Sequence, residues 1–290
     1  MKYAYYNSCS LRASGKDYAK SIEVVFSKLD IEAIEPKDWV CCGSTIAHHT
    51  SKMLALALPL KNLALVEEMG FNEFIIPCTA CYNRFKIAQY EYENDTELAA
   101  ELDDIIEYKY KNTVNIIHPI ELLNKDEYIE KIRKLATRDM TQLKVASYYG
   151  CLIVRPPKMI RFSDDHENPQ LMEKLLNAAG IKTTEWSYKT ECCGGSLSLT
   201  RPNKVIELSG RVLENVRAVG ANAIAVPCSF CQLNLDVRQE DMKSKHGKDY
   251  DMPIFYFSEL LALAIGVAEK DILLNKHFVD TKKVLTGVKV

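Results

Sequence analysis

The ten cysteines of this 290-residue chain form two copies of one pattern, and this repeat constrains the fold more than any other feature. Each copy has a single cysteine, then a Cys-Cys-Gly triplet, then a Cys-x-x-Cys pair. The first copy comprises Cys9, Cys41-Cys42-Gly43 and Cys78-Thr79-Ala80-Cys81, and the second Cys151, Cys192-Cys193-Gly194 and Cys228-Ser229-Phe230-Cys231. Since every cysteine in the sequence falls within the pattern, the chain is an internal duplication.

The segments around the cysteines repeat as well. The apolar run 74–77 before Cys78 resembles the run 224–227 before Cys228, and both end in proline. Glu121 and Glu259 recur near the end of the two copies, which suggests a structural role such as a helix cap. Solenoid units are only about 20 to 50 residues long, so a repeat of this size indicates two similar domains. We expect these domains at residues 1–138 and 139–290.

The pattern of apolar residues predicts an α/β fold. Short apolar runs predict strands at 2–6, 74–77, 143–149 and 223–227. Helices are expected at 16–29, 82–92, 170–179, 203–219, 232–243 and 45–69, the last of them broken near Pro59. Because strands alternate with helices, each copy is predicted to be a small parallel sheet flanked by helices.

Four of the cysteines directly follow a predicted strand: Cys9, Cys78, Cys151 and Cys228. Residues just past the carboxyl ends of parallel strands gather where ligands bind in open α/β sheets. Three segments of each copy can therefore converge at one sheet edge and present five thiolates. Gly43 and the pair Gly194-Gly195 would let the backbone turn tightly beside a bulky group.

Five thiolates in each copy limit the ligand. Thiolates select zinc, Cu(I) and iron–sulfur clusters. A structural zinc and a regular cubane cluster each take about four cysteines. Neighbouring side chains diverge, so one ion rarely takes both members of a Cys-Cys pair, and five thiolates suit a larger or opened cluster better. A Cys-x-x-Cys pair alone would fit a zinc knuckle or a redox dithiol equally well.

Composition bounds the remaining classes of protein. The formal net charge of −2 gives no indication of a nucleic-acid binder. No apolar segment of signal-peptide type follows the N-terminal residues. The most apolar stretch, 53–66, is interrupted by Pro59 and Lys61, and a membrane span needs about 20 residues. We therefore expect a soluble cytoplasmic protein without direct membrane insertion.

The repeated cysteine pattern resembles the cysteine-rich CCG domain. Two complete copies filling a chain of this size closely resemble the B subunit of the heterodisulfide reductase of methanogens. In that family each set of five cysteines holds a noncubane [4Fe–4S] cluster. The resemblance implies that Cys9, Cys41, Cys42, Cys78 and Cys81 hold one cluster, and that Cys151, Cys192, Cys193, Cys228 and Cys231 hold the other. A longer gap before Cys192 indicates a loop insertion that leaves the ligands intact.

The resemblance also implies a reaction and partners. The family reduces the mixed disulfide of coenzyme M and coenzyme B to two thiols, and two clusters flanking one disulfide give the duplication a reason. The chain has no ferredoxin cysteine run and no G-x-G-x-x-G motif, so we expect no flavin or nicotinamide in it. Implied electron donors are the ferredoxin-like iron–sulfur subunit and the flavin-containing subunit of the reductase, with a hydrogenase or formate dehydrogenase beside them.

Candidate substrate residues follow from the charge of the implied substrate. A sulfonate, a phosphate and carboxylates need cationic partners. The cations near the two cluster loops are Arg12, Lys16, Arg155, Lys158 and Arg161. His48 and His49, shortly after Cys42, are candidate proton donors because histidine titrates near neutrality. A solvated surface charge is the plain alternative for each cation, and a structural histidine for the other two.

Two other functions fit the same pattern. Paired CCG domains also occur in subunits of succinate dehydrogenases, fumarate reductases, and glycolate or lactate oxidases that pass electrons to a quinone or another disulfide. The chain could instead be a structural zinc-binding subunit. Metal analysis separates zinc binding from the two redox functions, because both of those require iron and sulfide.

Overall fold

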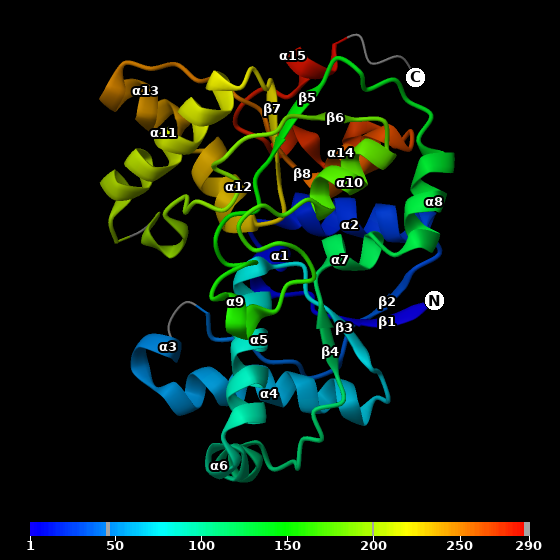
Figure 1. Cartoon of the computed structure of the whole chain (residues 1–290), viewed down its shortest axis with the longest axis vertical. Helices are drawn as coiled ribbons and strands as arrows, with labels where there is room; N and C mark the ends of the chain where they lie inside the picture. Colours follow the sequence, from blue (N-terminus) through cyan, green and yellow to red (C-terminus); the bar gives the residue numbers. More distant parts are fainter. Residues whose placement is uncertain (45–46, 199, 287–290) are drawn as a thin grey trace.

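Both halves of the chain are α/β units built on one plan, as the sequence predicts (Figure 1). The computed structural model describes residues 1–44, 47–198 and 200–286. Each half has a four-stranded sheet with all strands parallel, in the order β2-β1-β3-β4 in the first and β6-β5-β7-β8 in the second. The strands are β1 (Lys2–Tyr5), β2 (Glu32–Ile34), β3 (Glu73–Ile75), β4 (Asn115–Ile117), β5 (Lys144–Ser147), β6 (Lys182–Thr183), β7 (Ala223–Val226) and β8 (Ile254–Tyr256).

The helices and 3-10 turns fill the space around the two sheets. In the first half they are α1 (Cys9–Arg12), α2 (Lys16–Lys28), α3 (Ala47–Thr50), α4 (Lys52–Glu68), α5 (Thr79–Asn94), α6 (Thr96–Ile106), α7 (Pro119–Leu123) and α8 (Asp126–Leu135). In the second half they are α9 (Pro157–Ile160), α10 (Leu171–Ala178), η1 (Gly195–Ser198), α11 (Pro202–Ala218), α12 (Ser229–Asp236), α13 (Gln239–His246), α14 (Phe257–Ala264), η2 (Glu269–Ile272), η3 (Leu274–Lys276) and α15 (Lys282–Leu285).

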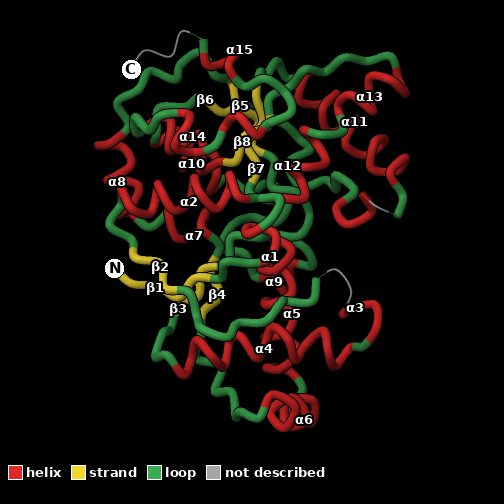
Figure 2. Tube along the Cα trace, turned by 180° about the vertical axis from the view of Figure 1, so that it is seen from behind, coloured by secondary structure: helices red, strands yellow, loops and turns green. Residues whose placement is uncertain are grey.

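One layer of helices lies between the two sheets and is shared by both halves (Figures 1 and 2). α2 of the first half packs on α14 of the second, and α10 of the second half packs on α7 and α8 of the first. α2 and α10 occupy the same place in the chain order of their halves, as do α7 and α14. The contacts are therefore reciprocal, as expected for two copies related by an approximate two-fold axis.

Side chains in this layer bind the halves together. The Tyr18 ring of α2 stacks on that of Tyr256 with centroids 4.4 Å apart. The hydroxyls of Ser21 and Ser258 lie 2.6 Å apart in a buried position. Each contact joins residues that are distant in the sequence, so buried side chains of one half pack directly against those of the other.

Two predicted helices differ from the structure. α4 runs unbroken through Pro59, whose ring and missing N–H normally disfavour a helix interior. Pro59 is buried, and packing of α4 on both sides offsets that cost. The break comes earlier, where the Ser51 hydroxyl accepts a hydrogen bond from Leu54 N at 3.3 Å. The predicted helix 232–243 is two helices, α12 and α13, and residues 45–46 of the predicted helix 45–69 lie outside the described residues.

The repeated glutamates do cap helices, as predicted. Glu121 accepts from His118 N at 2.8 Å, and Glu259 accepts from Tyr256 N at 2.8 Å. Each satisfies a free N–H at the start of the helix that follows the last strand of its sheet, α7 or α14. The predicted domain boundary at 138/139 falls in the segment between α8 and β5 and stays a prediction.

Candidate metal centres

Each half brings its five cysteines to the carboxyl ends of its strands. Cys9 begins α1 after β1, and Cys151 lies in the loop after β5. Cys78 and Cys228 are the N-cap residues of α5 and α12, directly after β3 and β7. The Cys-Cys-Gly triplets reach the same edge from loops. The predicted convergence of three segments in each half is thus present in the structure.

The thiols of each half contact one another in a chain. In the first half Cys9 approaches Cys41, Cys41 approaches Cys42, and Cys81 joins Cys42 to Cys78. The Cys42 and Cys81 sulfurs are 3.0 Å apart.

The second half repeats this arrangement. Cys151 approaches Cys192, and Cys231 contacts both Cys193 and Cys228. The sulfurs of Cys193 and Cys231 are 3.5 Å apart, matching the Cys42–Cys81 contact of the first half. In both halves the last three cysteines are buried, whereas the single cysteine and the first of the pair reach the surface at least in part.

Glycine shapes the Cys-Cys-Gly loops. Gly43 and Gly194 have φ values of +72° and +99°, which glycine adopts at little cost. These turns point the N–H groups of Gly43 and Gly194 at the sulfurs of Cys41 and Cys192, at 3.4 and 3.3 Å.

A tyrosine after the first strand of each sheet fixes the same loop. Tyr6 donates to Val40 O at 2.8 Å, and Tyr148 donates to Glu191 O at 2.6 Å. Both acceptors immediately precede the cysteine pair, so each loop is held at the same point in the two halves.

Hydrogen bonds within the clusters lower the pKa of several thiols. Bonds from Cys41 and Cys81 lower the pKa of Cys42 to about 4. A bond from Cys151 lowers the pKa of Cys192 to about 6, and one from Cys81 lowers that of Cys78 to about 7. The same hydrogen bonds raise the pKa of the partner thiols Cys41, Cys81 and Cys151, so each group favours some thiolates, the form that binds metal, beside protonated thiols.

Comparison with known proteins gives the family. A model of the cysteine-rich domain named CCG matches residues 3–86 and 145–236. The chain belongs to the CCG family of cysteine-rich domains. Each match includes all five cysteines of its half.

Relatives of similar length extend this result. The chain is 28% identical to the B subunit of a ferredoxin/F420H2-dependent CoB-CoM heterodisulfide reductase of Methanosarcina acetivorans, over 99% of this chain and 97% of the relative. It is 28% identical to the B subunit of a ferredoxin:CoB-CoM heterodisulfide reductase of Methanosarcina mazei, over 93% and 91%. The resemblance inferred from the cysteine pattern is confirmed.

Two further similarities are of other kinds. The 8-methylmenaquinol:fumarate reductase membrane anchor subunit of Wolinella succinogenes is 25% identical over 97% of this chain and 98% of its own. A crystal structure of a hypothetical protein from Helicobacter pylori shares the fold, with a TM-score of 0.75, 13% identity, and coverage of 97% of this chain and 52% of that one. Throughout the described residues, every helix is too short or too polar to span a bilayer.

The thiol sets of the two CCG domains fit a cluster better than a single ion. In the described part of the chain, three possible metal-ligand atoms lie within 4.8 Å of one another at Asp17, Glu259 and His277. No three cysteine sulfurs in that part of the chain are as close together. Five thiols spread over a wider space suit several metal atoms held together. The small cavity at the second set is lined by Cys151, Cys193, Cys228 and Cys231.

A polar side chain that the sequence analysis missed acts on the cysteine pair in each CCG domain. The charge of Arg84 on α5 favours the thiolate of Cys42. At the matching place on α12, Asn234 lies with Nδ2 3.6 Å from the Cys193 sulfur and donates to Gly195 O at 3.2 Å. Both residues stand three positions after the second cysteine of Cys-x-x-Cys, and this shared spacing was a usable signal.

His118 links the two cluster regions. Its Nε2 lies 2.9 Å from Pro77 O, while Nδ1 accepts from Ile120 N at 3.2 Å. It also hydrogen-bonds Pro227. These prolines precede Cys78 and Cys228, so one imidazole contacts the backbone beside a candidate ligand of each domain. Burial lowers the pKa of His118 to about 3, which keeps the ring neutral.

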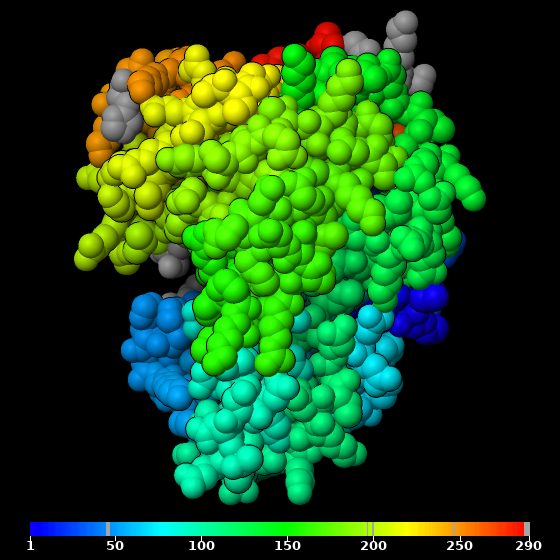
Figure 3. Space-filling model, in the orientation of Figure 1, coloured from blue at the N-terminus to red at the C-terminus, as the bar shows by residue number. Residues whose placement is uncertain are grey.

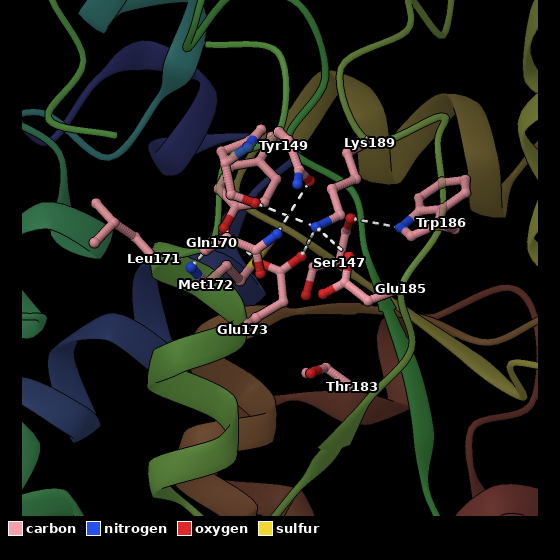
Figure 4. A network of polar contacts seen from close by, with 12 residues as sticks. Ser147, Tyr149, Gln170, Leu171, Met172, Glu173, Thr183, Glu185, Trp186 and Lys189 are labelled. Carbon is pink, nitrogen blue, oxygen red and sulfur yellow. Dashed lines mark hydrogen bonds and ion pairs between the residues drawn. The ribbon is translucent and has the colours of Figure 1, made fainter. Parts of the chain in front are cut away.

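A buried lysine supports the second centre (Figure 4). Lys189 is 1% exposed, and its ammonium lies 2.8 Å from Glu173 and 3.2 Å from Glu185. Its carbonyl accepts from the N–H groups of Tyr149 and Gly150, and the Tyr149 hydroxyl donates to Glu173 at 2.6 Å. The network ties the loop before Cys151 to the segment that leads to Cys192.

The predicted proton donors lie beside the first centre. His48 is partly buried and His49 exposed on α3, with ring centroids 3.9 Å apart. Burial and the nearby charge of Arg84 lower the pKa of His48. Their role in proton transfer stays a prediction.

Two of the predicted substrate cations are near Cys9. Arg12 ends α1, pairs with Glu35 and lies over the Trp39 ring at 5.0 Å. Lys16 is exposed at the start of α2. Both side chains are therefore accessible to solvent.

The other three cations lie on the segment after Cys151. Arg155 pairs with Glu167 at 3.0 Å. Arg161 pairs with Glu93 of α5 at 2.9 Å, and both Arg161 and Lys158 lie over the Tyr90 ring. This green segment covers the cyan residues of α5 in the space-filling view (Figure 3). The structure thus gives Lys158 and Arg161 contacts with the first CCG domain, and a role in binding substrate stays a prediction.

Proposed function

We propose that this chain is the catalytic subunit of a heterodisulfide reductase and reduces the mixed disulfide of coenzymes M and B at two noncubane [4Fe–4S] clusters. The observation that carries the proposal is the pair of complete five-thiol sites on adjoining faces of the two domains. Relatives named as the B subunits of such reductases, similar over nearly the full chain, support the same reaction.

The reaction consumes two electrons and two protons, breaks one S–S bond and forms two S–H bonds. Iron–sulfur clusters supply one-electron transfer and iron that binds sulfur. In this proposal Cys9, Cys41, Cys42, Cys78 and Cys81 hold one cluster. Cys151, Cys192, Cys193, Cys228 and Cys231 hold the other.

Residues at the domain interface hold the two centres in a fixed relative position. Asn83 of α5 donates to the carbonyls of Leu152 and Arg155, both at 2.8 Å. These carbonyls lie in the segment just after Cys151. Together with the His118 contacts, this fixes the geometry between a ligand loop of one domain and one of the other. Such fixed spacing is what a disulfide held between two centres requires.

Partners and compartment belong to the same proposal. Electrons would come from a ferredoxin-like iron–sulfur subunit and a flavin-containing subunit of the reductase, with a hydrogenase or formate dehydrogenase as a further partner in a larger assembly. Free thiols suited to metal binding persist in a reducing compartment, so we place the protein in the cytoplasm. Arg12, Lys16, Arg155, Lys158 and Arg161 are the proposed anion contacts, and His48 or His49 the proposed proton donor.

Metal content and activity test the proposal. Anaerobically purified protein should hold about eight irons and equal sulfide, as two four-iron clusters require. With a strong one-electron donor it should reduce the heterodisulfide. Stoichiometric zinc with little iron would overturn the cluster assignment.

The similarity to a methylmenaquinol:fumarate reductase subunit favours a second candidate. In that case the chain would pass electrons between a quinone and partner subunits. Protein with both clusters intact that is inactive on the heterodisulfide and active with quinones would decide for this alternative.

A further inference from the structure

The residue after the first cysteine of each Cys-x-x-Cys pair carries a buried hydroxyl. Thr79 is 1% exposed and Ser229 is 5% exposed. Neither hydroxyl oxygen has a hydrogen-bond partner within the described residues. Leaving a buried hydroxyl unpaired is destabilising, so the same feature in both copies calls for a missing acceptor.

Thr79 belongs to the first domain but lies at the thiols of the second. It lines the cavity formed by Cys151, Cys193, Cys228 and Cys231. The cysteines of its own domain are absent from the described residues that line this cavity. Thr79 therefore lies across the domain interface, at the thiols of the second domain.

Ser229 of the second domain likewise lies against the first domain. Its Cβ would lie 3.3 Å from a Cβ placed on Gly15, in the turn that follows the helix begun by Cys9. The absence of a side chain at Gly15 gives Ser229 room at this point. Each residue therefore sits at the first turn of a helix of one domain and against the other domain: Thr79 at the thiols of the second domain, and Ser229 at the turn after the helix that Cys9 begins.

The packing that places Thr79 is rigid. α5 packs on α9, and the two hydrogen bonds of Asn83 lie one helical turn beyond Thr79. Thr79 is also the first residue of the 16-residue α5, where unpaired N–H groups favour negative charge. A polar group fixed in this way can act on an anionic cluster without further ordering.

We propose that Thr79 donates a hydrogen bond to a sulfur of the cluster in the second domain, and Ser229 to one in the first, so that each domain sets the reduction potential of the other's cluster. The inference rests on the clusters of the proposed function. Hydrogen bonds to cluster sulfur stabilise the more negative reduced state and raise the potential. The two hydroxyls are positioning residues rather than ligands.

Redox titration of the intact holoprotein, followed by electron paramagnetic resonance, tests the crossing. Thr79→Val keeps the side-chain shape and removes the hydroxyl, whereas Thr79→Ser keeps the hydroxyl. We expect Thr79→Val to lower the ratio of reduced to oxidised second-domain cluster about tenfold at a given potential. For a one-electron couple this equals a reduction potential lower by about 59 mV. Thr79→Ser should retain the wild-type potential. Ser229→Ala should shift the first-domain cluster instead.

Cys42→Ser and Cys193→Ser preparations assign each signal to its domain. The inference would be overturned if the shift were confined to the cluster of the substituted residue's own domain. It would also be overturned if neither cluster shifted while the iron content stayed full. Either result would leave the proposed function intact. Absence of iron and sulfide from the wild type would overturn the proposed function itself.

Discussion

The two CCG domains share a fold and a cysteine set but differ in the polar residues around them. At the matching place on α5 and α12, the first domain has the cation Arg84 and the second has the neutral Asn234. A positive charge near a cluster stabilises its reduced form more than an amide does. The two copies thus share the cysteines but not the polar residues near them, and this difference can make two similar centres electronically different.

The ion pairs near the cysteine loops also differ between the two domains. The second domain relies on the buried pair of Lys189 and Glu173, whereas Arg12 and Glu35 form a solvent-exposed pair in the first. Buried pairs are costly to break and exposed ones contribute little. The second centre should therefore depend more strongly on single charged residues than the first.

The largest expected effect is the loss of one cluster while the other remains. Cys42→Ser should remove the cluster of the first domain and Cys193→Ser that of the second, each reducing iron from about eight to about four per chain. Either change should abolish disulfide reduction, because the substrate needs both centres. Iron analysis and spectroscopy on folded protein measure this. Loss of both clusters from one change would contradict the assignment of each set to its own domain.

Lys189→Met should destabilise the protein by about 3–5 kcal/mol, since it leaves the buried Glu173 carboxylate unpaired. Arg12→Ala, the control in the first domain, should cost about 1 kcal/mol or less because its pair is exposed. Denaturant unfolding of anaerobic protein measures both. If Glu173→Leu added to Lys189→Met recovers no stability, the loss does not come from the unpaired carboxylate.

Two buried histidines should give stability opposite dependences on pH. Burial lowers the folded-state pKa of His118 to about 3, so its contribution is lost as pH falls below about 6.5. Burial opposes charge on His277, but the facing carboxylates of Glu259, Asp236 and Asp17 raise its pKa to about 9. The His277 contribution is therefore full below pH 6.5 and is lost as pH rises through about 9.

Denaturant midpoints across this pH range test the difference. His277→Gln should remove the alkaline decline, which we expect to reach about 3 kcal/mol for a shift of this size. His118→Gln should reduce the acid decline instead. An unchanged alkaline limb in His277→Gln would show that the ring is neutral in the folded protein.

Arg84→Asn should make the first centre resemble the second. Removing the cation should lower the potential of the first-domain cluster by about 59 mV, equal to a tenfold change in its redox equilibrium. Arg84→Lys, which keeps the charge, should restore most of the wild-type value. Equal effects of Arg84→Asn on both clusters would argue for a structural change rather than a local charge.

The smallest expected effect concerns the substrate cations. Arg155→Ala or Lys158→Ala should raise KM by about fivefold to tenfold with little change in kcat, because a contact to a remote anion is made equally in ground and transition states. Both side chains are partly or fully exposed, which limits the effect. Steady-state kinetics after a check of cluster content would decide it, and a wild-type KM in both variants would direct attention to Arg12 and Lys16.

Much of the fold followed from local pattern. The strands that precede Cys9, Cys78, Cys151 and Cys228 are apolar and largely buried, so their sequence is distinctive. The sequence analysis missed the edge strands β2, β4, β6 and β8. β2 and β6 are short and partly exposed, with no buried face to impose a pattern. β4 and β8 are largely buried, but each has only three residues, which is too short to show a period. The continuity of α4 through Pro59 was missed because packing outweighed an unfavourable residue.

The sequence alone determined the duplication, the ten cysteines and the family, since ligand chemistry depends on residue type and spacing. Only the tertiary structure decided which residues surround the thiols. Arg84 and Lys189 act on Cys42 and Glu173, which are distant from them in the sequence. His118 and Thr79 contact groups of the other domain, and no local spacing announces a contact that crosses between domains. Those contacts arise because each half must bury its helices against the other, which brings the two centres face to face.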